Sequence, residues 1–442
     1  MAQEEQGTSK IPACDDYFEV IQSRKRLPFS LQESLTNAFA QIPVSSFPQV
    51  PGGKVIEIPA DSSVIAAVRI LSEHNIMAAP VSNAVVGSIT DWKDRYLGII
   101  DYFAVILWML ENAELAAFSL YAGSATAAAL GTGAFGGLGA VALGATGPAV
   151  VSGVTLASAV AALAGGIAAE RSMGGDAIKA ADHLGDQFYE LLLQEEPFKS
   201  TTVKSIVETY RWSPFLPVAA DSSMLTVLLL LSKYRLRNVP VIDVEKLYIK
   251  NFITQSAVVQ GLKQCKGRDW FDCIAACPLS DLGLPFTSHD EVISVHSDDL
   301  VLEAFKRMKD NRIGGLPVVE HPSKKIVGCV SIKDIRFLFL RHELFSSFRK
   351  LTVMDFIKAV DSANHESGRP SAMQPLTCSR DVCLGSVIDR LASSSTHRIY
   401  VVEGDDVVGV VTLRDVISCF IFEPPGYFED YFKSGIKEML NP

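Results

Sequence analysis

The chain has 442 residues, of which 48% are hydrophobic and 20% are charged, so it can bury a sizeable core. Its formal net charge of −10 argues against a general affinity for nucleic acids or anionic membranes. The first ten residues, MAQEEQGTSK, are polar and acidic, and the eight cysteines lack the spacing of a disulfide framework. We therefore expect a cytoplasmic and/or nuclear protein with free thiols.

The first predicted element is a short helix near the N-terminus. Ser30-Leu31-Gln32-Glu33 has the pattern of a capping box, and the helix that it starts is expected to continue through Phe39. The nearby basic cluster Arg24-Lys25-Arg26 is small and is expected to be a solvated surface patch.

Downstream, four segments share one numbering frame, in which Pro80, Pro240, Pro317 and Tyr400 are equivalent. Apolar residues stand sixteen, thirteen, twelve and nine residues before each of them, which is the stripe of an amphipathic helix. The members of the four stripes are Val64, Ala67, Val68 and Leu71; Met224, Val227, Leu228 and Leu231; Val301, Ala304, Phe305 and Met308; and Leu384, Val387, Ile388 and Leu391. Nineteen residues before each reference position stands an aspartate (Asp61, Asp221, Asp298 and Asp381), which is expected to cap the helix or lie in its first turn.

Two strands and a second helix follow in each segment. A short β-type run begins after each reference position, and second strands are predicted at 96–100, 248–253, 326–330 and 407–411. A unit of about 60 residues is too small to cover both of its faces alone, so the units are expected to pair. The helix at 224–231 is apolar nearly all round, which indicates a buried seam between units. The predicted fold class is α/β, built from four such repeats.

The repeats are unevenly spaced, because a long insertion separates the first two. The predicted order is an N-terminal extension with a short helix (1–37), repeat 1 (38–112), a Gly/Ala-rich uncharged insertion (113–185), repeat 2 (186–263), a linker (264–279), repeat 3 (280–345), repeat 4 (346–422) and a C-terminal tail (423–442). Residues 115–169 carry no charge, and the window 149–169 is long enough to cross a bilayer. A low-complexity loop is the favoured interpretation, and a membrane-associated hairpin is the alternative.

The repeated unit resembles the CBS domain, a small βαββα module. Four copies resemble the gamma regulatory subunits of the AMP-activated / sucrose-non-fermenting protein kinase family, the plant members in particular. The phrases that carry this resemblance lie in order along the chain, at 42–48, 228–234, 253–256, 312–315, 397–402 and 423–428. The resemblance implies two modules, repeats 1 with 2 and 3 with 4, stacked as a disk. It also implies a heterotrimer with a catalytic alpha kinase subunit and a beta scaffold subunit.

In this family adenine nucleotides bind in the clefts of the modules, through the pattern Gly-h-h-[Ser/Thr]-x-x-Asp. Repeats 3 and 4 keep this pattern, whereas Ala104 and Ala257 replace the aspartate in repeats 1 and 2. Arg and His at other cleft positions would contact phosphate. The implied nucleotide-binding residues are Arg312, Ser331, Asp334, His397, Arg398, Thr412 and Asp415. Possible ligands are AMP, ADP or ATP, and no covalent cofactor is expected.

Taken alone, each of these residues also has a structural interpretation, since an aspartate at a helix start is most often a cap. No set of enzyme motifs was found, and the lone G-x-G-x-x-G at 131–136 follows no predicted strand. The predicted function is a non-catalytic regulatory subunit of a heterotrimeric Ser/Thr protein kinase that senses energy state. The alternatives are a membrane-associated CBS protein that regulates a transporter or channel, and a ligand-free interaction scaffold.

Overall fold

The computed structural model describes residues 12–83, 92–112, 199–210, 214–287, 291–320, 325–366, 371–394 and 396–428. The chain divides into two compact units. The first comprises Met1–Leu110, Thr202–Arg336 and Leu351–Pro442, and the second comprises Glu111–Thr201 and Phe337–Lys350. All four sheets belong to the first unit. The whole of the predicted insertion (113–185), including 115–169, lies outside the described residues.

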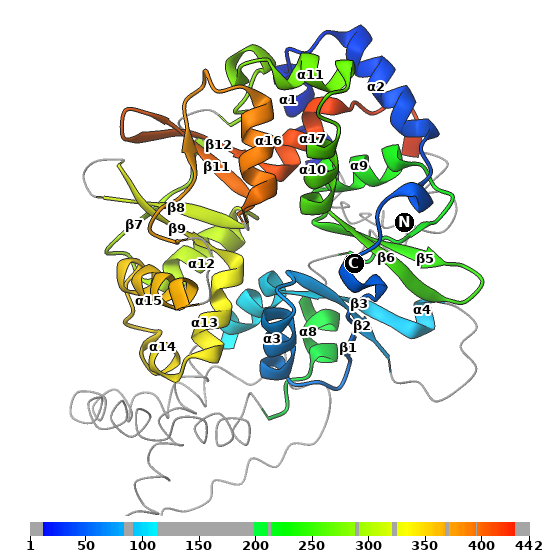
Figure 1. The fold of residues 1–442 in the computed structure, drawn as a ribbon. Coiled ribbons are helices and arrows are strands. Elements are labelled where there is room, and N and C mark those ends of the chain that lie inside the picture. Colours follow the sequence, from blue (N-terminus) through cyan, green and yellow to red (C-terminus); the bar gives the residue numbers. More distant parts are fainter. Residues whose placement is uncertain are drawn as a thin grey trace, which may run out of the picture. The chain divides into compact units, whose positions relative to one another are not determined.

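Four three-stranded sheets repeat one topology, in which the first strand is parallel to the second and the second is antiparallel to the third (Figure 1). The strands are β1 (Ile58–Pro59), β2 (Ala78–Ser82) and β3 (Tyr96–Asp101); β4 (Val218–Ala219), β5 (Asn238–Asp243) and β6 (Tyr248–Thr254); β7 (Val295–His296), β8 (Gly315–Val319) and β9 (Ile326–Ser331); and β10 (Thr377–Cys378), β11 (Arg398–Glu403) and β12 (Asp406–Thr412). The pairs Ile58↔Val81, Val218↔Val241, Val295↔Val318 and Cys378↔Val401 are each 23 residues apart. The four repeats therefore share one register, as predicted.

The predicted apolar stripes lie on the helices that follow the first strand of each sheet, α3 (Val64–Glu73), α9 (Met224–Ser232), α12 (Val301–Asp310) and α16 (Leu384–Ser393). All sixteen stripe residues are buried. The helices after the third strands are residues 102–112, α10 (Gln255–Gln264), α13 (Ile335–Leu340) and α17 (Leu413–Phe420). The repeat architecture predicted from periodicity is thus confirmed.

The role predicted for the four aspartates is wrong. The helices begin at Val64, Met224, Val301 and Leu384, so their N-caps are Ser63, Ser223, Leu300 and Cys383. Asp61, Asp221, Asp298 and Asp381 lie two residues before these caps, in the turn that follows the first strand. Aspartate is common in such turns, because its short side chain bonds to nearby backbone amides.

Repeats 1 and 2 exchange their leading segments. The segment 42–50 precedes β1, the first strand of repeat 1, but packs on repeat 2, where Val44 N donates to Ser222 O at 2.8 Å. Conversely α8 (Val203–Tyr210) precedes β4, the first strand of repeat 2, but packs on β3 of repeat 1, and Val203 N donates to Ser62 O at 2.9 Å. Each of the two repeats therefore completes the other.

Repeats 3 and 4 make the same exchange. Leu279 N, in the segment before repeat 3, donates to Val382 O of repeat 4 at 3.0 Å. Val301 N of repeat 3 donates to Leu351 O at 2.9 Å, in the segment that leads into α15 (Val353–Glu366) and repeat 4. This reciprocity confirms the predicted pairing of repeats 1 with 2 and 3 with 4.

In every repeat the exchanged segment crosses the third strand at one equivalent position. These positions, each opposite the valine that follows the reference residue, are Gly98, Asn251, Gly328 and Gly409. A Cβ on the three glycines would overlap Val207, Ile357 and Pro285 respectively, all of which lie on exchanged segments. Asn251 instead bonds the crossing chain, since its amide donates to Pro48 O at 3.0 Å and its oxygen accepts from Val50 N at 3.0 Å.

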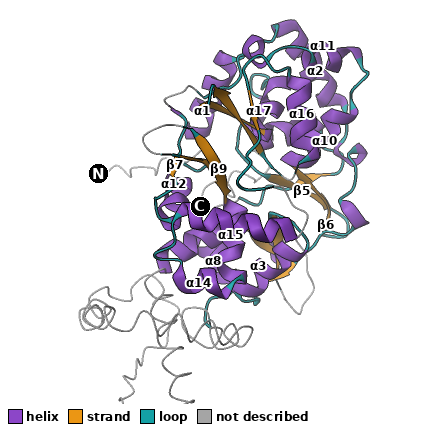
Figure 2. Ribbon diagram, turned by 60° about the vertical axis from the view of Figure 1, so that its left-hand side comes forward, coloured by secondary structure: helices purple, strands orange, loops and turns teal. Residues whose placement is uncertain are grey.

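Helices of repeats 2 and 4 share one core across the two modules. α10 packs against α16 and α17, and α9 packs against α17. Every residue of α9 is buried, which confirms the predicted seam. Figure 2 shows α10, α16 and α17 gathered with α2 and α11 (Asp269–Ala275) on one side of the sheets.

The predicted N-terminal helix is confirmed, but its capping box is wrong. α2 (Phe29–Gln41) begins after Pro28, so Ser30 already lies within the helix, and no side chain caps the helix start. α2 packs against α9 and α17. A further helix, α1 (Pro12–Arg24), precedes it and was not predicted.

The basic cluster 24–26 is only in part the solvated patch that was predicted, because Arg26 is exposed whereas Lys25 bonds the end of a helix. Lys25 Nζ donates to Ser418 O at 2.9 Å and also bonds Ile421 O, at the C-terminal end of α17. A cation at this end of a helix satisfies its terminal carbonyls and faces the negative end of its dipole. Burial lowers the pKa of Lys25 to about 8. Arg24 forms an ion pair with Glu291 at 3.0 Å.

The remaining described helices are α4 (Trp92–Arg95) and, in the second unit, α14 (His342–Ser347). Within the second unit the ring of Phe345 contacts those of Phe339 and Phe348, with centroids 5.9 and 5.7 Å away. Over the ranges that the structure describes, no helix combines the length and hydropathy that a bilayer span requires.

The crossing at Gly409 gives a stability prediction. In Gly409→Ala the new methyl group meets the rigid Pro285 ring, so we expect a loss of about 1–3 kcal/mol in the free energy of unfolding. Gly261→Ala is the matched control, because Gly261 lies inside α10 and a Cβ there would make only an ordinary van der Waals contact with Phe47, 3.8 Å away. There alanine should raise stability by about 0.5–1 kcal/mol. Urea unfolding measures both changes, and equal effects would contradict the tight crossing.

Candidate functional site

The candidate site begins where the third strand of each repeat passes into its following helix. Four equivalent residues stand there: Asp101, Thr254, Ser331 and Thr412. Asp101 Oδ1 accepts from Ala104 N at 2.8 Å, and Thr254 Oγ1 accepts from Ala257 N at 3.1 Å. Each of these side chains therefore caps its helix, which fixes its position at the end of the sheet.

In repeats 3 and 4 an aspartate three residues on completes a reciprocal cap. Asp334 Oδ2 accepts from the N–H and the hydroxyl of Ser331, both at 2.8 Å. Asp415 Oδ2 accepts from the N–H of Thr412 at 2.8 Å and from its hydroxyl at 2.7 Å. Both carboxylates are buried, and all these bonds use Oδ2. The second oxygen of each carboxylate is left for another donor.

A second set of equivalent residues stands at the start of the middle strand of each sheet, the first position just before the strand and the second position as its first residue. Met77, Arg237, Gly314 and His397 occupy one position of it, and Ala78, Asn238, Gly315 and Arg398 occupy the next. Arg398 of repeat 4 lies over the two glycines of repeat 3. Its Nη1 bonds Gly315 O, and a Cβ on Gly315 would stand 2.6 Å from that nitrogen. The glycine pair therefore makes room for this guanidinium group.

His397 lies among cations and is neutral at pH 7. Burial, followed by the charges of Lys333, Arg398 and Arg237, lowers the pKa of His397 to about 3. Its Nε2 is 3.2 Å from the Ser256 hydroxyl of repeat 2. In this state the imidazole offers a hydrogen bond to a ligand rather than the positive charge that the resemblance implies.

Arg237 of repeat 2 reaches repeat 1. Its Nη1 is 3.1 Å from Asp101 Oδ2, and its guanidinium carbon lies 5.2 Å from the centroid of the Phe103 ring. Burial lowers the pKa of Arg237, the Asp101 charge raises it, and the charges of Arg398 and Arg414 lower it. Arg237 therefore shares one electrostatic environment with two arginines of the other module.

The structure brings some of the predicted site residues together. His397 and Arg398 are neighbours, and both Arg398 and Asp334 act electrostatically on the Tyr400 hydroxyl. The pairs Ser331–Asp334 and Thr412–Asp415 are each joined locally. Arg312 occupies a left-handed turn (φ 52°) before β8, equivalent to Asn75 and Arg235, so its implied contact with phosphate stays a prediction.

Sequence reasoning missed Lys333 and Arg414 as members of this cluster, and it did not expect the contact between Asp101 and Arg237. Lys333 and Arg414 occupy the same position, two residues after the capping hydroxyl, where Phe103 and Ser256 stand in repeats 1 and 2. The signal was present in the shared register, because equivalent positions of the four repeats meet at one junction, where the ends of their sheets lie near each other. Comparing the repeats position by position for charge would have found them.

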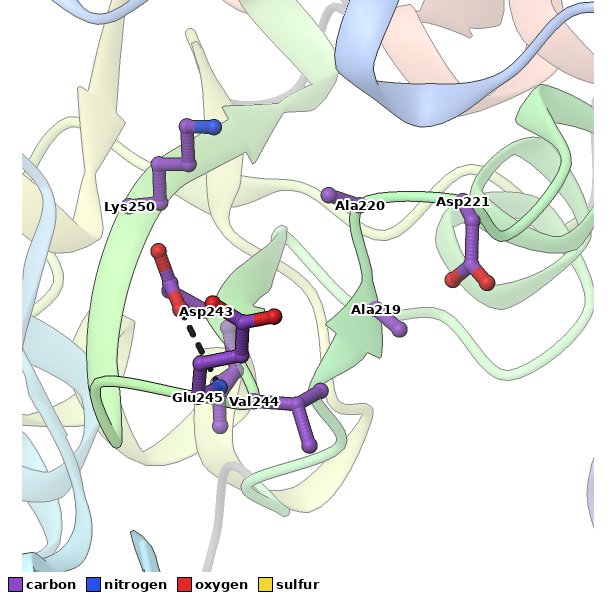
Figure 3. A pocket seen from close by; sticks show the side chains of 8 residues that line it. Ala219, Ala220, Asp221, Asp243, Val244, Glu245 and Lys250 are labelled. Carbon is purple, nitrogen blue, oxygen red and sulfur yellow. Dashed lines mark hydrogen bonds between the residues drawn. The ribbon is translucent and has the colours of Figure 1, made fainter.

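A cavity of about 250 Å³ lies elsewhere, at the other end of the second sheet (Figure 3). Asp221, Asp243, Glu245 and Lys250 contribute its charged groups, and Asp243 Oδ1 accepts from Glu245 N at 3.1 Å. Ile242 and Asp243 end β5, whereas Arg237 and Asn238 stand at its start. None of the seven predicted site residues lines this cavity.

The state of His397 gives a pH prediction. The unfolded chain gains a proton on this residue near pH 6.5 and the folded chain only near pH 3, so the unfolded state binds more protons between these values. The contribution of His397 to stability is full above pH 6.5 and is lost as the pH falls towards 3. His397→Gln should therefore flatten the acid dependence of unfolding, by at most about 1.4 kcal/mol per pH unit.

Urea unfolding at about pH 7.5 and about pH 5 measures this change. His74→Gln is the matched control, because His74 is exposed at the end of α3 and its substitution should leave the acid dependence as in the wild type. An unchanged acid dependence in His397→Gln would show that this histidine is not held neutral by its surroundings.

Known proteins similar to this chain include a domain family, a solved structure and two curated relatives. The CBS domain family matches residues 283–341 and 373–421. A protein of Methanocaldococcus jannaschii, described as an archaeal homologue of the gamma subunit of AMPK, has the same fold, with a TM-score of 0.50 and 12% sequence identity over 84% of this chain and all of that one.

Two curated relatives from Arabidopsis thaliana cover nearly the whole chain. The "SNF1-related protein kinase regulatory subunit gamma-1-like" is 60% identical over 98% of this chain and 97% of its own length. The "SNF1-related protein kinase regulatory subunit gamma-1" is 34% identical over 91% of this chain and 87% of its own length. Together with the four paired repeats, these similarities show that the chain belongs to the gamma regulatory subunits of the SNF1-related protein kinases.

Proposed function

We propose that this chain is the non-catalytic gamma-type subunit of a heterotrimeric Ser/Thr protein kinase, with a catalytic alpha subunit and a beta scaffold subunit as partners. The similarity over 98% of the chain to a relative named as a kinase regulatory subunit carries the proposal. The proposal includes a cytoplasmic and/or nuclear location for the chain. In this role the chain would bind a ligand and the other subunits and so regulate the kinase, and it would not catalyse a reaction itself.

The second part of the proposal is that the module of repeats 3 and 4 binds an adenine nucleotide, namely AMP, ADP or ATP. The second oxygens of Asp334 and Asp415 would accept hydrogen bonds from ribose hydroxyls. Ser331 and Thr412 would donate to phosphate, and Arg398 would supply charge, with His397 as a neutral hydrogen-bond partner and Arg312 as a further cation. Repeats 1 and 2 lack this aspartate. Ala104 and Ala257 stand in its place, and alanine has no side-chain oxygen that could accept a hydrogen bond from ribose.

A ligand-free scaffold is the second candidate, and the caps favour it. Ser331 and Thr412 already donate to Asp334 and Asp415, and Arg398 already bonds Gly315 O, so these groups have structural roles without a ligand. Nucleotide binding must therefore exchange some internal bonds for bonds to the ligand. The membrane-associated alternative depends on 115–169, which lies outside the described residues.

The nucleotide proposal predicts that Asp415→Ala and Asp334→Ala each weaken binding at their own repeat. Loss of charge-assisted bonds should lower the affinity for AMP, ADP or ATP by at least about tenfold, measured by calorimetry. Asp355→Ala is the matched control. Asp355 accepts from the Thr352 hydroxyl at 2.8 Å in the same kind of cap, but at the start of α15. If all three variants bind as the wild type does, the site assignment is wrong.

The subunit proposal predicts the partners. Affinity purification of the tagged chain from its own tissue, followed by mass spectrometry, should recover a Ser/Thr kinase catalytic subunit and a beta-type subunit. The chain should also leave membranes on carbonate extraction. Recovery of a transporter or channel together with a carbonate-resistant chain would favour the membrane alternative, and recovery of neither kinase subunit would contradict the proposal.

A further inference from the structure

Repeat 1 carries a carboxylate where repeats 2, 3 and 4 carry a hydroxyl. Asp101 stands at the position of Thr254, Ser331 and Thr412, and it caps its helix as they do, through Oδ1. Capping occupies one oxygen only. The other, Oδ2, lies 3.1 Å from Arg237 Nη1. The acid therefore keeps the structural role of the hydroxyl and adds an anion to the junction.

The Arg237 side chain that binds this anion lies near two further arginines. Arg237 lies at the position of His397 in the repeat frame, and a Cβ on Gly314 of repeat 3 would stand 3.7 Å from its Nη2. Arg398 and Arg414 are close enough for their charges to act on Arg237. The Asp101 side chain is 2% exposed and the Arg237 side chain 28%. Arg237 is thus reachable from solvent, whereas its internal anion is sealed off.

The Asp101 carboxylate is buried, so water could not replace Arg237 as its partner. Arginine recognises carboxylate and phosphate oxygens by the same planar donors, so either anion can satisfy a guanidinium group. Arg237 therefore already holds an anion that belongs to the chain itself, the Asp101 carboxylate, and the charges of Arg398 and Arg414 act on the same guanidinium group.

We propose that Asp101 is a built-in anion that occupies the phosphate position of Arg237, so that the junction of repeats 1 and 2 excludes phosphate-bearing ligands until this charge is removed. The inference goes beyond the proposed function, since it concerns the first module and does not depend on nucleotide binding by repeats 3 and 4. Asp101 is in this sense a residue that determines which module can bind a phosphate.

The test removes the charge and keeps the cap. Asp101→Asn retains an oxygen for Ala104 N but offers Arg237 no anion. With inorganic pyrophosphate as the probe, calorimetry should show one additional binding site relative to the wild type, at least about tenfold tighter than any wild-type binding there. Asp101→Asn combined with Arg237→Gln should lose that additional site, because the guanidinium group is gone.

Asp243→Asn is the matched control, since it removes one negative charge from the same module and keeps the oxygen that caps Glu245 and Lys246. It should gain no site. A folded Asp101→Asn protein without the additional site would overturn the proposal and leave the ion pair a structural one. If Asp101→Asn unfolds, pyrophosphate should restore its circular dichroism spectrum, and failure to do so would overturn the proposal equally.

The result of the pyrophosphate test can be told apart from the result of the nucleotide-binding tests of the proposed function. Asp334→Ala and Asp415→Ala test nucleotide binding in repeats 3 and 4, and they leave Asp101 and Arg237 in place. A wild-type chain that binds no AMP would contradict the nucleotide proposal, whereas the additional pyrophosphate site of Asp101→Asn would still be measured in the first module.

Discussion

The crossing of each third strand by its partner's leading segment is the contact on which the module depends. At Gly98, Gly328 and Gly409 the crossing chain lies so close that no Cβ fits, and at Asn251 a side-chain amide bonds it instead. Because each repeat lends its leading segment to its partner, neither repeat of a pair is complete alone. The pairing therefore places the ends of two sheets, with their caps and charges, beside each other.

Within this frame the same positions carry different chemistry. The hydroxyl and aspartate pair occurs in repeats 3 and 4, whereas repeat 1 has an acid and an alanine and repeat 2 a hydroxyl and an alanine. The backbone role is constant, since every one of these positions caps a helix. Fold and ligand chemistry are thus separable, because a cap needs only one acceptor oxygen and the remaining atoms of the side chain are free to vary.

The sequence predicted the repeats and their register, because each rests on a local pattern that recurs four times, whereas the pairing of repeats 1 with 2 and 3 with 4 was implied by the family resemblance. It did not predict the exchange of leading segments, or the core that α9 and α17 share, because contacts between distant segments leave no periodic signal. Some local predictions were also wrong. Lys25 bonds the end of a helix nearly 400 residues away, a contact that leaves no local signal. The other errors concern where helices begin, since Pro28 rather than Ser30 precedes α2 and the four aspartates lie two residues before their helix caps. Of the candidate site, the caps were visible in the motif, whereas the arginine cluster required all four repeats to be placed around one junction.

The complete burial of α9 bears on how the chain is made. Repeat 2 obtains part of its apolar cover from α17, which leaves the ribosome roughly 190 residues after α9. Until then the nine-residue helix α9, all of whose residues are buried in the complete fold, lacks the part of its cover that α17 supplies, and exposed apolar surface of this kind promotes aggregation. The first module is therefore a poor candidate for expression alone, and a nascent chain that stalls before repeat 4 is a natural client for chaperones.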